Sequence, residues 1–176
     1  MVAVGNTGYN SMFQVWDVKT GKVLVRLTGH KDVVTAVQFS SDGTKLISGS
    51  WDRTVKIWDT ATWHELKSFA GHTSAVRSVA LSSDGTLLLT GADDKTMRLW
   101  DVASGEELAL FSGMTGQVTS VAFSPDGQTA VSGTNHNEVL EWRVFTSKAL
   151  ETWVHENRYI PPANCEELTR YRLPCL

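Results

Sequence analysis

The sequence predicts an all-β protein built from repeated sheets of four antiparallel strands. The first observation is a ladder of tryptophans with a constant spacing of 42 residues: Trp16, Trp58, Trp100 and Trp142. The second is a pair of glycine columns with the same spacing: Gly29, Gly71 and Gly113, and Gly43, Gly85 and Gly127. The third is that each interval holds four short β-branched or apolar runs separated by turn residues. A unit of this length cannot bury its apolar faces alone, so neighbouring units must stack.

The composition and charge of the 176-residue chain restrict its class and its partners. Hydrophobic residues make up 41%, and the net charge of −3 comes without a basic stripe for a phosphate backbone. We therefore expect no nucleic-acid partner, and no membrane partner because no apolar run reaches the length of a span. Met1 to Asn10 lack the pattern of a signal peptide. Cys165 and Cys175, both outside the repeats, fit a reducing, cytoplasmic setting, and their pairing stays open.

The four runs of one repeat are expected at residues 33–39, 45–48, 54–58 and 66–69. An Asp-Gly turn at Asp42-Gly43 joins the first two runs, because glycine there supplies the positive φ of a tight hairpin. The same turn returns at Asp84-Gly85 and Asp126-Gly127.

The pairs Gly29-His30 and Trp58-Asp59, placed among four short strands, make the repeat resemble the WD40 family. The resemblance covers residues 2–153 and implies a β-propeller segment of about four blades arranged around an axis. The interpretation divides the chain into this segment, residues 1–153, and a tail, residues 154–176.

The resemblance also implies a buried hydrogen-bonded set in each blade, formed by a His, a Ser or Thr, an Asp and the repeat Trp. These sets are His30, Ser48, Asp52 and Trp58, and His72, Thr90, Asp94 and Trp100. A third set departs from the pattern: Met114, Ser132, His136 and Trp142. In the first repeat, Asn6 and Asn10 stand at the Ser and Asp positions. We expect the terminal blades to be less rigid for this reason.

The two ends of the repeat region bear on whether the blades form a complete ring. Residues 2–4 align with a second strand, so the first blade is expected to lack its innermost strand. Leu150 and Trp153 continue two apolar columns and predict a last outer strand. Most WD40 propellers have about seven blades. Three explanations stay open: a fragment of a longer propeller, a ring completed by a second copy or by a partner's blades, and a small closed ring.

The tail predicts a short helix from Cys165 to Arg172, with Asn164 as N-cap and Glu167 completing a capping box. Its sequence also resembles the end of large bacterial WD40 proteins, in which the propeller follows a protein kinase or a NACHT-type NTPase. This second resemblance is shorter than the first.

No motif for catalysis, for a cofactor or for a metal is present in the repeats. We therefore expect no enzyme activity and no cofactor. His136 has two interpretations, a structural substitute for the usual Asp or a binding residue.

The face that carries the loop before the first strand and the turn before the third is where partners often dock on WD40 proteins. By alignment, its candidate residues are Tyr9, Lys31, Val33, Trp51, Thr73, Ala75, Asp93, Thr115, Gln117 and Asn135. Trp51 stands out because later repeats place polar residues at its position. It is interpreted either as a binding anchor or as packing against the next loop.

These observations predict a non-catalytic scaffold that binds a protein or peptide. The alternative is the C-terminal sensor or regulatory propeller of a larger bacterial signalling protein.

Overall fold

The computed structural model describes residues 2–4 and 12–144, and this part of the chain is made of strands and turns with no helix. The first sheet contains β1 (Val2–Val4), β2 (Phe13–Trp16) and β3 (Val23–Leu27). The second contains β4 (Val34–Phe39), β5 (Lys45–Ser50), β6 (Thr54–Asp59) and β7 (Glu65–Ala70). The third contains β8 (Val76–Leu81), β9 (Leu87–Ala92), β10 (Met97–Asp101) and β11 (Glu107–Phe111). The fourth contains β12 (Val118–Phe123), β13 (Thr129–Thr134) and β14 (Val139–Arg143).

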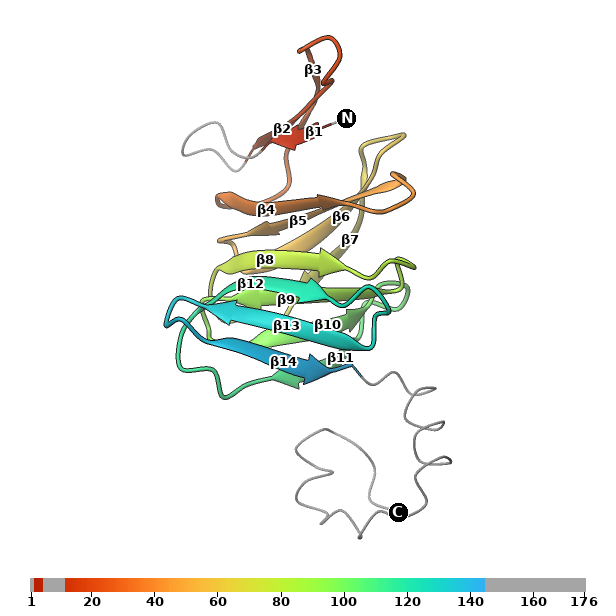
Figure 1. Ribbon diagram of the computed structural model, residues 1–176. Helices are drawn as coiled ribbons and strands as arrows, with labels where there is room; N and C mark the ends of the chain where they lie inside the picture. Colours follow the sequence, from red (N-terminus) through yellow and green to blue (C-terminus); the bar gives the residue numbers. More distant parts are fainter. Residues whose placement is uncertain (1, 5–11, 145–176) are drawn as a thin grey trace, which may run out of the picture.

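Each sheet is antiparallel and takes its strands in chain order, and the sheets follow one another along the molecule (Figure 1). The all-β prediction is confirmed, and each predicted run in residues 33–69 lies within one or two residues of a strand. In the first sheet, β1 pairs with β2 as β5 pairs with β6, so residues 2–4 hold the second-strand position. The predicted strand near Leu150 and the predicted helix from Cys165 to Arg172 lie outside the described residues.

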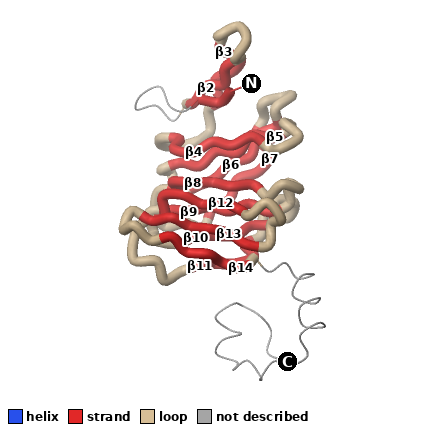
Figure 2. The backbone as a smooth tube through the Cα atoms, viewed as in Figure 1, coloured by secondary structure: helices blue, strands red, loops and turns tan. Residues whose placement is uncertain are grey.

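The first strands of successive sheets lie side by side. The Thr35 hydroxyl of β4 donates to the Val76 carbonyl of β8 at 2.5 Å, and the Leu81 N–H donates to Gln38 Oε1 at 2.9 Å. The same kind of bond links β8 to β12, where the Val121 N–H donates to Ser78 Oγ at 3.1 Å. The second, third and fourth sheets therefore meet along β4, β8 and β12, the arrangement of consecutive propeller blades (Figure 2).

An apolar cluster fills each junction between neighbouring sheets. An aromatic residue of one sheet meets the repeat tryptophan of the next: the Phe13 and Trp58 ring centroids are 5.8 Å apart, and those of Phe69 and Trp100 are 5.7 Å apart. Such edge-to-face contacts add to the stability gained from apolar burial. The tryptophan ladder thus marks the points at which one sheet is pressed against the next.

Small residues in the second strands allow this close approach. A Cβ built on Gly49 would lie 2.9 Å from Val76 Cγ1, and one built on Gly91 would lie 2.5 Å from Val118 Cγ1. The equivalent Gly133 meets nothing closer than Ser120 of its own sheet, at 3.8 Å. Val139 lies beside Gly133 on the same face of the fourth sheet and is 75% exposed. The equivalent residue of the second sheet, Val55, is only 1% exposed. No described residue covers the outer face of the fourth sheet at these positions.

Candidate functional site

The second and third sheets each contain a buried hydrogen-bonded chain that ends at the loop face. In the second sheet, Trp58 Nε1–H donates to Ser48 Oγ at 2.8 Å, and Ser48 Oγ lies 2.8 Å from His30 Nε2. His30 Nδ1 lies 2.9 Å from Asp52 Oδ2. An ionised carboxylate only accepts, so Nδ1 carries the proton and the Ser48 hydroxyl donates to Nε2. The structure brings His72, Thr90, Asp94 and Trp100 together in the same way, with distances of 2.7 to 2.9 Å.

The aspartate at the end of each chain holds the loop that precedes the first strand. Asp52 accepts the backbone N–H of Lys31 at 2.8 Å and that of Thr54 at 2.9 Å. Asp94 accepts the N–H of Thr73 at 2.9 Å. The loop and the turn of one sheet are thereby fixed to each other, which positions the side chains on that face.

In the hydrogen-bonded chain of the second sheet, the surroundings favour a neutral His30 beside an ionised Asp52. Burial lowers the pKa of His30 below its ordinary value of 6.5, against the hydrogen bond and charge of Asp52, which act to raise it. Burial acts to raise the pKa of Asp52, but hydrogen bonds from Thr54, Lys31 and His30 outweigh it and lower this pKa from 3.8 to about 2. The pKa of Asp94 also lies well below its ordinary value.

In the fourth sheet, the corresponding hydrogen-bonded chain consists of different residue types. Trp142 Nε1–H donates to Ser132 Oγ at 2.8 Å, and the Ser132 hydroxyl points to Met114 Sδ at 3.7 Å. His136 reaches Thr115, with 3.4 Å from its Nδ1 to Thr115 Oγ1. The N–H of Thr115 is accepted instead by Glu138 Oε2 at 3.0 Å. Sequence reasoning did not identify this role of Glu138.

The predicted docking residues lie in pairs, because the loop and the turn of each sheet are joined by one backbone hydrogen bond. Trp51 N–H donates to the Val33 carbonyl at 2.9 Å, Asp93 N–H to the Ala75 carbonyl at 2.9 Å, and Asn135 N–H to the Gln117 carbonyl at 3.0 Å. Lys31, Thr73 and Thr115 are the loop residues whose N–H groups are held by the acids. Tyr9 lies outside the described residues.

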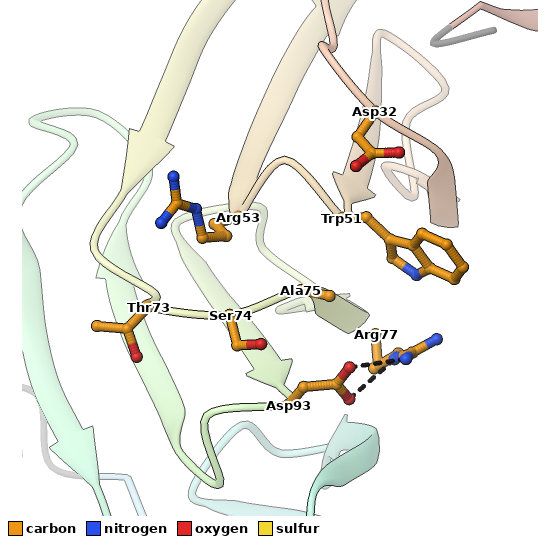
Figure 3. A pocket seen from close by; sticks show the side chains of 8 residues that line it. All are labelled: Asp32, Trp51, Arg53, Thr73, Ser74, Ala75, Arg77 and Asp93. Carbon is orange, nitrogen blue, oxygen red and sulfur yellow. Dashed lines mark hydrogen bonds and ion pairs between the residues drawn. The ribbon is translucent and has the colours of Figure 1, made fainter. Parts of the chain in front are cut away.

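A cavity of about 340 Å³ opens where the loop faces of the second and third sheets meet (Figure 3). We call it the Trp51 cleft, and its lining residues are Asp32, Trp51, Arg53, Thr73, Ser74, Ala75, Arg77 and Asp93. Four of these were predicted from the sequence: Trp51, Thr73, Ala75 and Asp93. The structure does not place Lys31, Val33, Thr115, Gln117 or Asn135 in this lining.

One arginine links the two sides of the Trp51 cleft. Arg77 Nε–H and Nη2–H donate to the two oxygens of Asp93, at 2.9 and 2.7 Å. The Arg77 guanidinium carbon also lies 5.2 Å from the centroid of the Trp51 ring, within the range of a cation–π contact. The hydrogen bonds that Arg77 donates to Asp93 raise the pKa of Arg77. Trp51 therefore packs against the next sheet through Arg77 and still leaves 43% of its surface exposed.

A second cavity, of about 470 Å³, lies along the ends of β4, β8 and β12 and has mainly apolar lining residues such as Val79 and Phe123.

In the described part of the chain, no group of three or more His, Cys, Asp or Glu residues is arranged to hold a metal ion. Nor do the described residues form a helix that is long and apolar enough to cross a membrane.

The second, third and fourth antiparallel sheets meet along their first strands, and each contains a hydrogen-bonded chain anchored by its tryptophan. These features define a repeat protein of the β-propeller class. The profile of the WD40 family, described as WD domain, G-beta repeat, matches residues 21–59, 63–101 and 105–143. These matches cover more than half of the chain, and the chain belongs to the WD40 family.

Individual relatives match over about one repeat. A guanine nucleotide-binding protein subunit beta of Schizosaccharomyces pombe is 42% identical over 43 residues, 24% of this chain and 14% of that protein. Subunit beta-5b of Danio rerio is 46% identical over 50 residues, 28% of this chain and 13% of that protein. A periodic tryptophan protein 2 homolog of Neurospora crassa is 48% identical over 42 residues, 24% of this chain and 5% of that protein. The matched stretch thus spans a small part of each relative's length.

Proposed function

We propose that this chain is a non-catalytic scaffold that binds a protein or peptide partner through the loop face of its sheets, at the Trp51 cleft. Membership of the WD40 family supports this function, because propellers of this kind present loops on a rigid frame. The beta subunits among the relatives are named as parts of a guanine nucleotide-binding protein, an assembly of subunits.

The observation that carries the proposal is the exposure of Trp51. It is a large aromatic side chain, 43% exposed, on a face whose loops are fixed by Asp52 and Asp94. Trp and Arg side chains are the residues that most often dominate binding energy at interfaces. The cleft presents both, since Arg77 lies against the Trp51 ring.

The test is affinity capture with the full chain, followed by a direct binding measurement with each purified captured protein. A matched pair of substitutions separates the loop face from the rest of the surface: Trp51→Ala at the cleft, and Leu66→Ala on β7, where the leucine is 53% exposed. We expect a partner that Leu66→Ala retains and Trp51→Ala loses, with both variants folded by circular dichroism. Equal binding to both variants would contradict a docking role for the cleft.

Three finer proposals go with this function. A second copy of the chain, or blades from a partner, would complete the ring beyond the four described sheets. The setting of the protein would be cytoplasmic. The regulatory portion of a larger bacterial signalling protein remains the alternative, supported by the resemblance of the tail.

A further inference from the structure

The outer face of the fourth sheet is equivalent to the faces that the second and third sheets bury against a neighbour. At each of those two junctions, three apolar side chains pack against the first strand of the next sheet, and none is more than 2% exposed. They are Ile47, Val55 and Ile57 in the second sheet and Leu89, Met97 and Leu99 in the third, and the equivalents in the fourth are Val131, Val139 and Glu141. Since Val139 is 75% exposed, covering this face with apolar side chains would be favourable.

The observed junctions show what kind of strand covers such a face. The apolar residues at the first, fourth and sixth positions of a first strand pack against the preceding sheet, as Val76, Val79 and Leu81 do in β8. The second, third and fifth positions bond to the following sheet. These bonds are made by Thr35 and Gln38 of β4 and by Ser78 of β8. A covering strand therefore needs apolar side chains at its first, fourth and sixth positions.

Residues 168–173, Leu-Thr-Arg-Tyr-Arg-Leu, have this pattern. Leu168, Tyr171 and Leu173 take the first, fourth and sixth positions, and Thr169, Arg170 and Arg172 take the others. Polar side chains at these other positions suit a strand whose far side faces water, as the end units of stacked repeats do. The exact 42-residue spacing selects residues 160–165 instead, where Ile160 is the only large apolar side chain at the three packing positions.

The sizes of the side chains are complementary. Val131 and Val139 are smaller than Leu89 and Met97 of the third sheet, whereas Leu168 and Tyr171 are larger than the valines of β12. Exchanges that keep the total volume are the ones that a packed junction tolerates best. Leucine and tyrosine also have a single γ carbon, which can turn away from Gly133, whereas a β-branched valine cannot avoid a neighbour in this way.

The polar groups of the fourth sheet also have partners in this segment. Glu141 needs a hydrogen-bond donor once it is covered, and Tyr171 brings a hydroxyl to the packing side. Thr119 donates to the Gly133 carbonyl at 3.2 Å, as Thr35 does to that of Gly49, and the Thr35 hydroxyl also reaches a carbonyl of the next first strand. The equivalent carbonyl in the segment is that of Leu168.

We propose that residues 168–173 fold back as an extended strand over the outer face of the fourth sheet. Leu168, Tyr171 and Leu173 pack on this face, and the Tyr171 hydroxyl donates to Glu141. Leu168 lies 24 residues after Val144, where the described part ends, so the connection can span up to about 80 Å. The segment holds the face in the free chain, and a sheet that completes the ring would have to displace it.

This strand is the alternative to the helix that the capping signals predict for residues 165–172, and it does not depend on the docking function of the Trp51 cleft. Nuclear magnetic resonance of the full chain, labelled with ¹³C and ¹⁵N, decides between them. We expect strand-type backbone chemical shifts at residues 168–173 and nuclear Overhauser contacts between the Tyr171 ring and the Val139 methyl groups. Helical shifts, or the absence of these contacts, would overturn the proposal.

Two matched substitutions test which side of the strand faces the sheet. Tyr171→Asp places a charge on the packing side and should release the segment, so that the Val139 methyl signals shift and the contacts of Leu168 with the sheet disappear. Arg170→Asp changes the charge on the outward side and should leave both unchanged. Equal loss in the two variants would show that the assigned sides are wrong.

A second pair tests the hydrogen bond to Glu141. Tyr171→Phe should weaken the Leu168 contacts severalfold, because the covered carboxylate loses its donor. Adding Glu141→Leu, the residue type of Leu99, should restore them. Unchanged contacts in Tyr171→Phe would overturn this bond.

A mixture of labelled and unlabelled chains identifies the source of the segment. We expect no contacts between the two kinds of chain. Contacts that join a labelled segment to an unlabelled sheet would assign the cover to a second copy and overturn folding back within one chain.

Discussion

The backbone N–H of Thr115 donates to the Glu138 carboxylate at 3.0 Å, and this contact replaces the one that an aspartate makes in the two preceding sheets. There, Asp52 and Asp94 accept the N–H groups of Lys31 and Thr73 at 2.8 and 2.9 Å. Glu138 lies two residues further along the turn, at the position of Thr54 and Thr96 in the repeat. Its longer side chain reaches the same donor, so the loop of the fourth sheet keeps its anchor although His136 has replaced the acid.

We predict that Glu138→Ala loosens this loop. The amide of Thr115 loses its acceptor and should exchange its hydrogen faster, while the amides of Lys31 and Thr73 keep their protection. Hydrogen exchange followed residue by residue measures both. The pKa of Glu138 is lowered by its hydrogen bonds with Thr115, so acid below the ordinary range of a glutamate should have the same effect on the native chain.

A compensating variant serves as the control for Glu138→Ala. The double substitution His136→Asp with Glu138→Thr returns the carboxylate to the position it has in the other sheets. Protection of the Thr115 amide should then be restored. Protection that stays low in the double variant, or never falls in Glu138→Ala, would show that the carboxylate does not anchor the loop.

Thr90→Val should destabilise the third sheet by about 1–3 kcal/mol, because one buried hydroxyl serves two partners. Thr90 Oγ1 accepts Trp100 Nε1–H at 2.9 Å and lies 2.7 Å from His72 Nε2. Valine keeps the shape of the side chain and leaves both groups without a partner. Urea denaturation measures the change in the free energy of unfolding. The control is Thr20→Val at an exposed turn, which should change this free energy by no more than about 0.5 kcal/mol. Equal midpoints for the two variants would contradict a stabilising role for the buried chain.

Acid should weaken the fold in two stages. His30 has a lowered pKa when folded, so below pH 6.5 the unfolded chain binds a proton that the folded chain resists, and stability falls. The pKa of Asp52 is lowered from 3.8 to about 2 in the folded chain. Its contribution to the free energy of unfolding is therefore fully present above pH 3.8 and is lost as the pH falls to about 2. The free energy of unfolding, measured by urea titration from neutral to acidic pH, should decline over both windows.

His30→Gln tests the first of these stages. The variant lacks the titrating imidazole, so its stability should change less between pH 6.5 and about pH 5 than that of the native chain. The second stage, due to the carboxylates, should remain. A decline of the same size above pH 5 in both proteins would assign the first stage to other groups.

The strands and the buried sets could be predicted from the sequence because their signals are local or repeat at a fixed interval. The Asp42-Gly43 turn and the Trp58 ladder fix the register of a sheet before any tertiary contact is known. The predicted bacterial origin, the helix from Cys165 to Arg172 and the outer strand near Leu150 remain predictions.

The parts of the site that the sequence did not predict depend on contacts with no repeat signal. Arg77 stands at the position of Thr35 and Thr119, so nothing in the column indicates an ion pair with Asp93 or a contact with Trp51 in the neighbouring sheet. Glu138 acts from outside its expected column through the length of its side chain. Arg77 and Glu138 each depart from the residue type that the other repeats hold at the same position. Their partners become visible only once the strands and loops are placed in space.

The glycines of the second strands offer a final prediction about how the sheets pack. Gly91→Ala places a Cβ within 2.5 Å of Val118 Cγ1, a contact that forces the third and fourth sheets apart. We expect a loss of about 1–3 kcal/mol, the usual cost of overpacking a core. Gly133→Ala, at the equivalent position of the fourth sheet, meets only Ser120 at 3.8 Å and should stay within about 0.5 kcal/mol. Thermal and urea unfolding of both variants measure the difference. A large loss for Gly133→Ala would mean that the outer face of the fourth sheet is covered in solution, and an unchanged Gly91→Ala would contradict the close packing at the third junction.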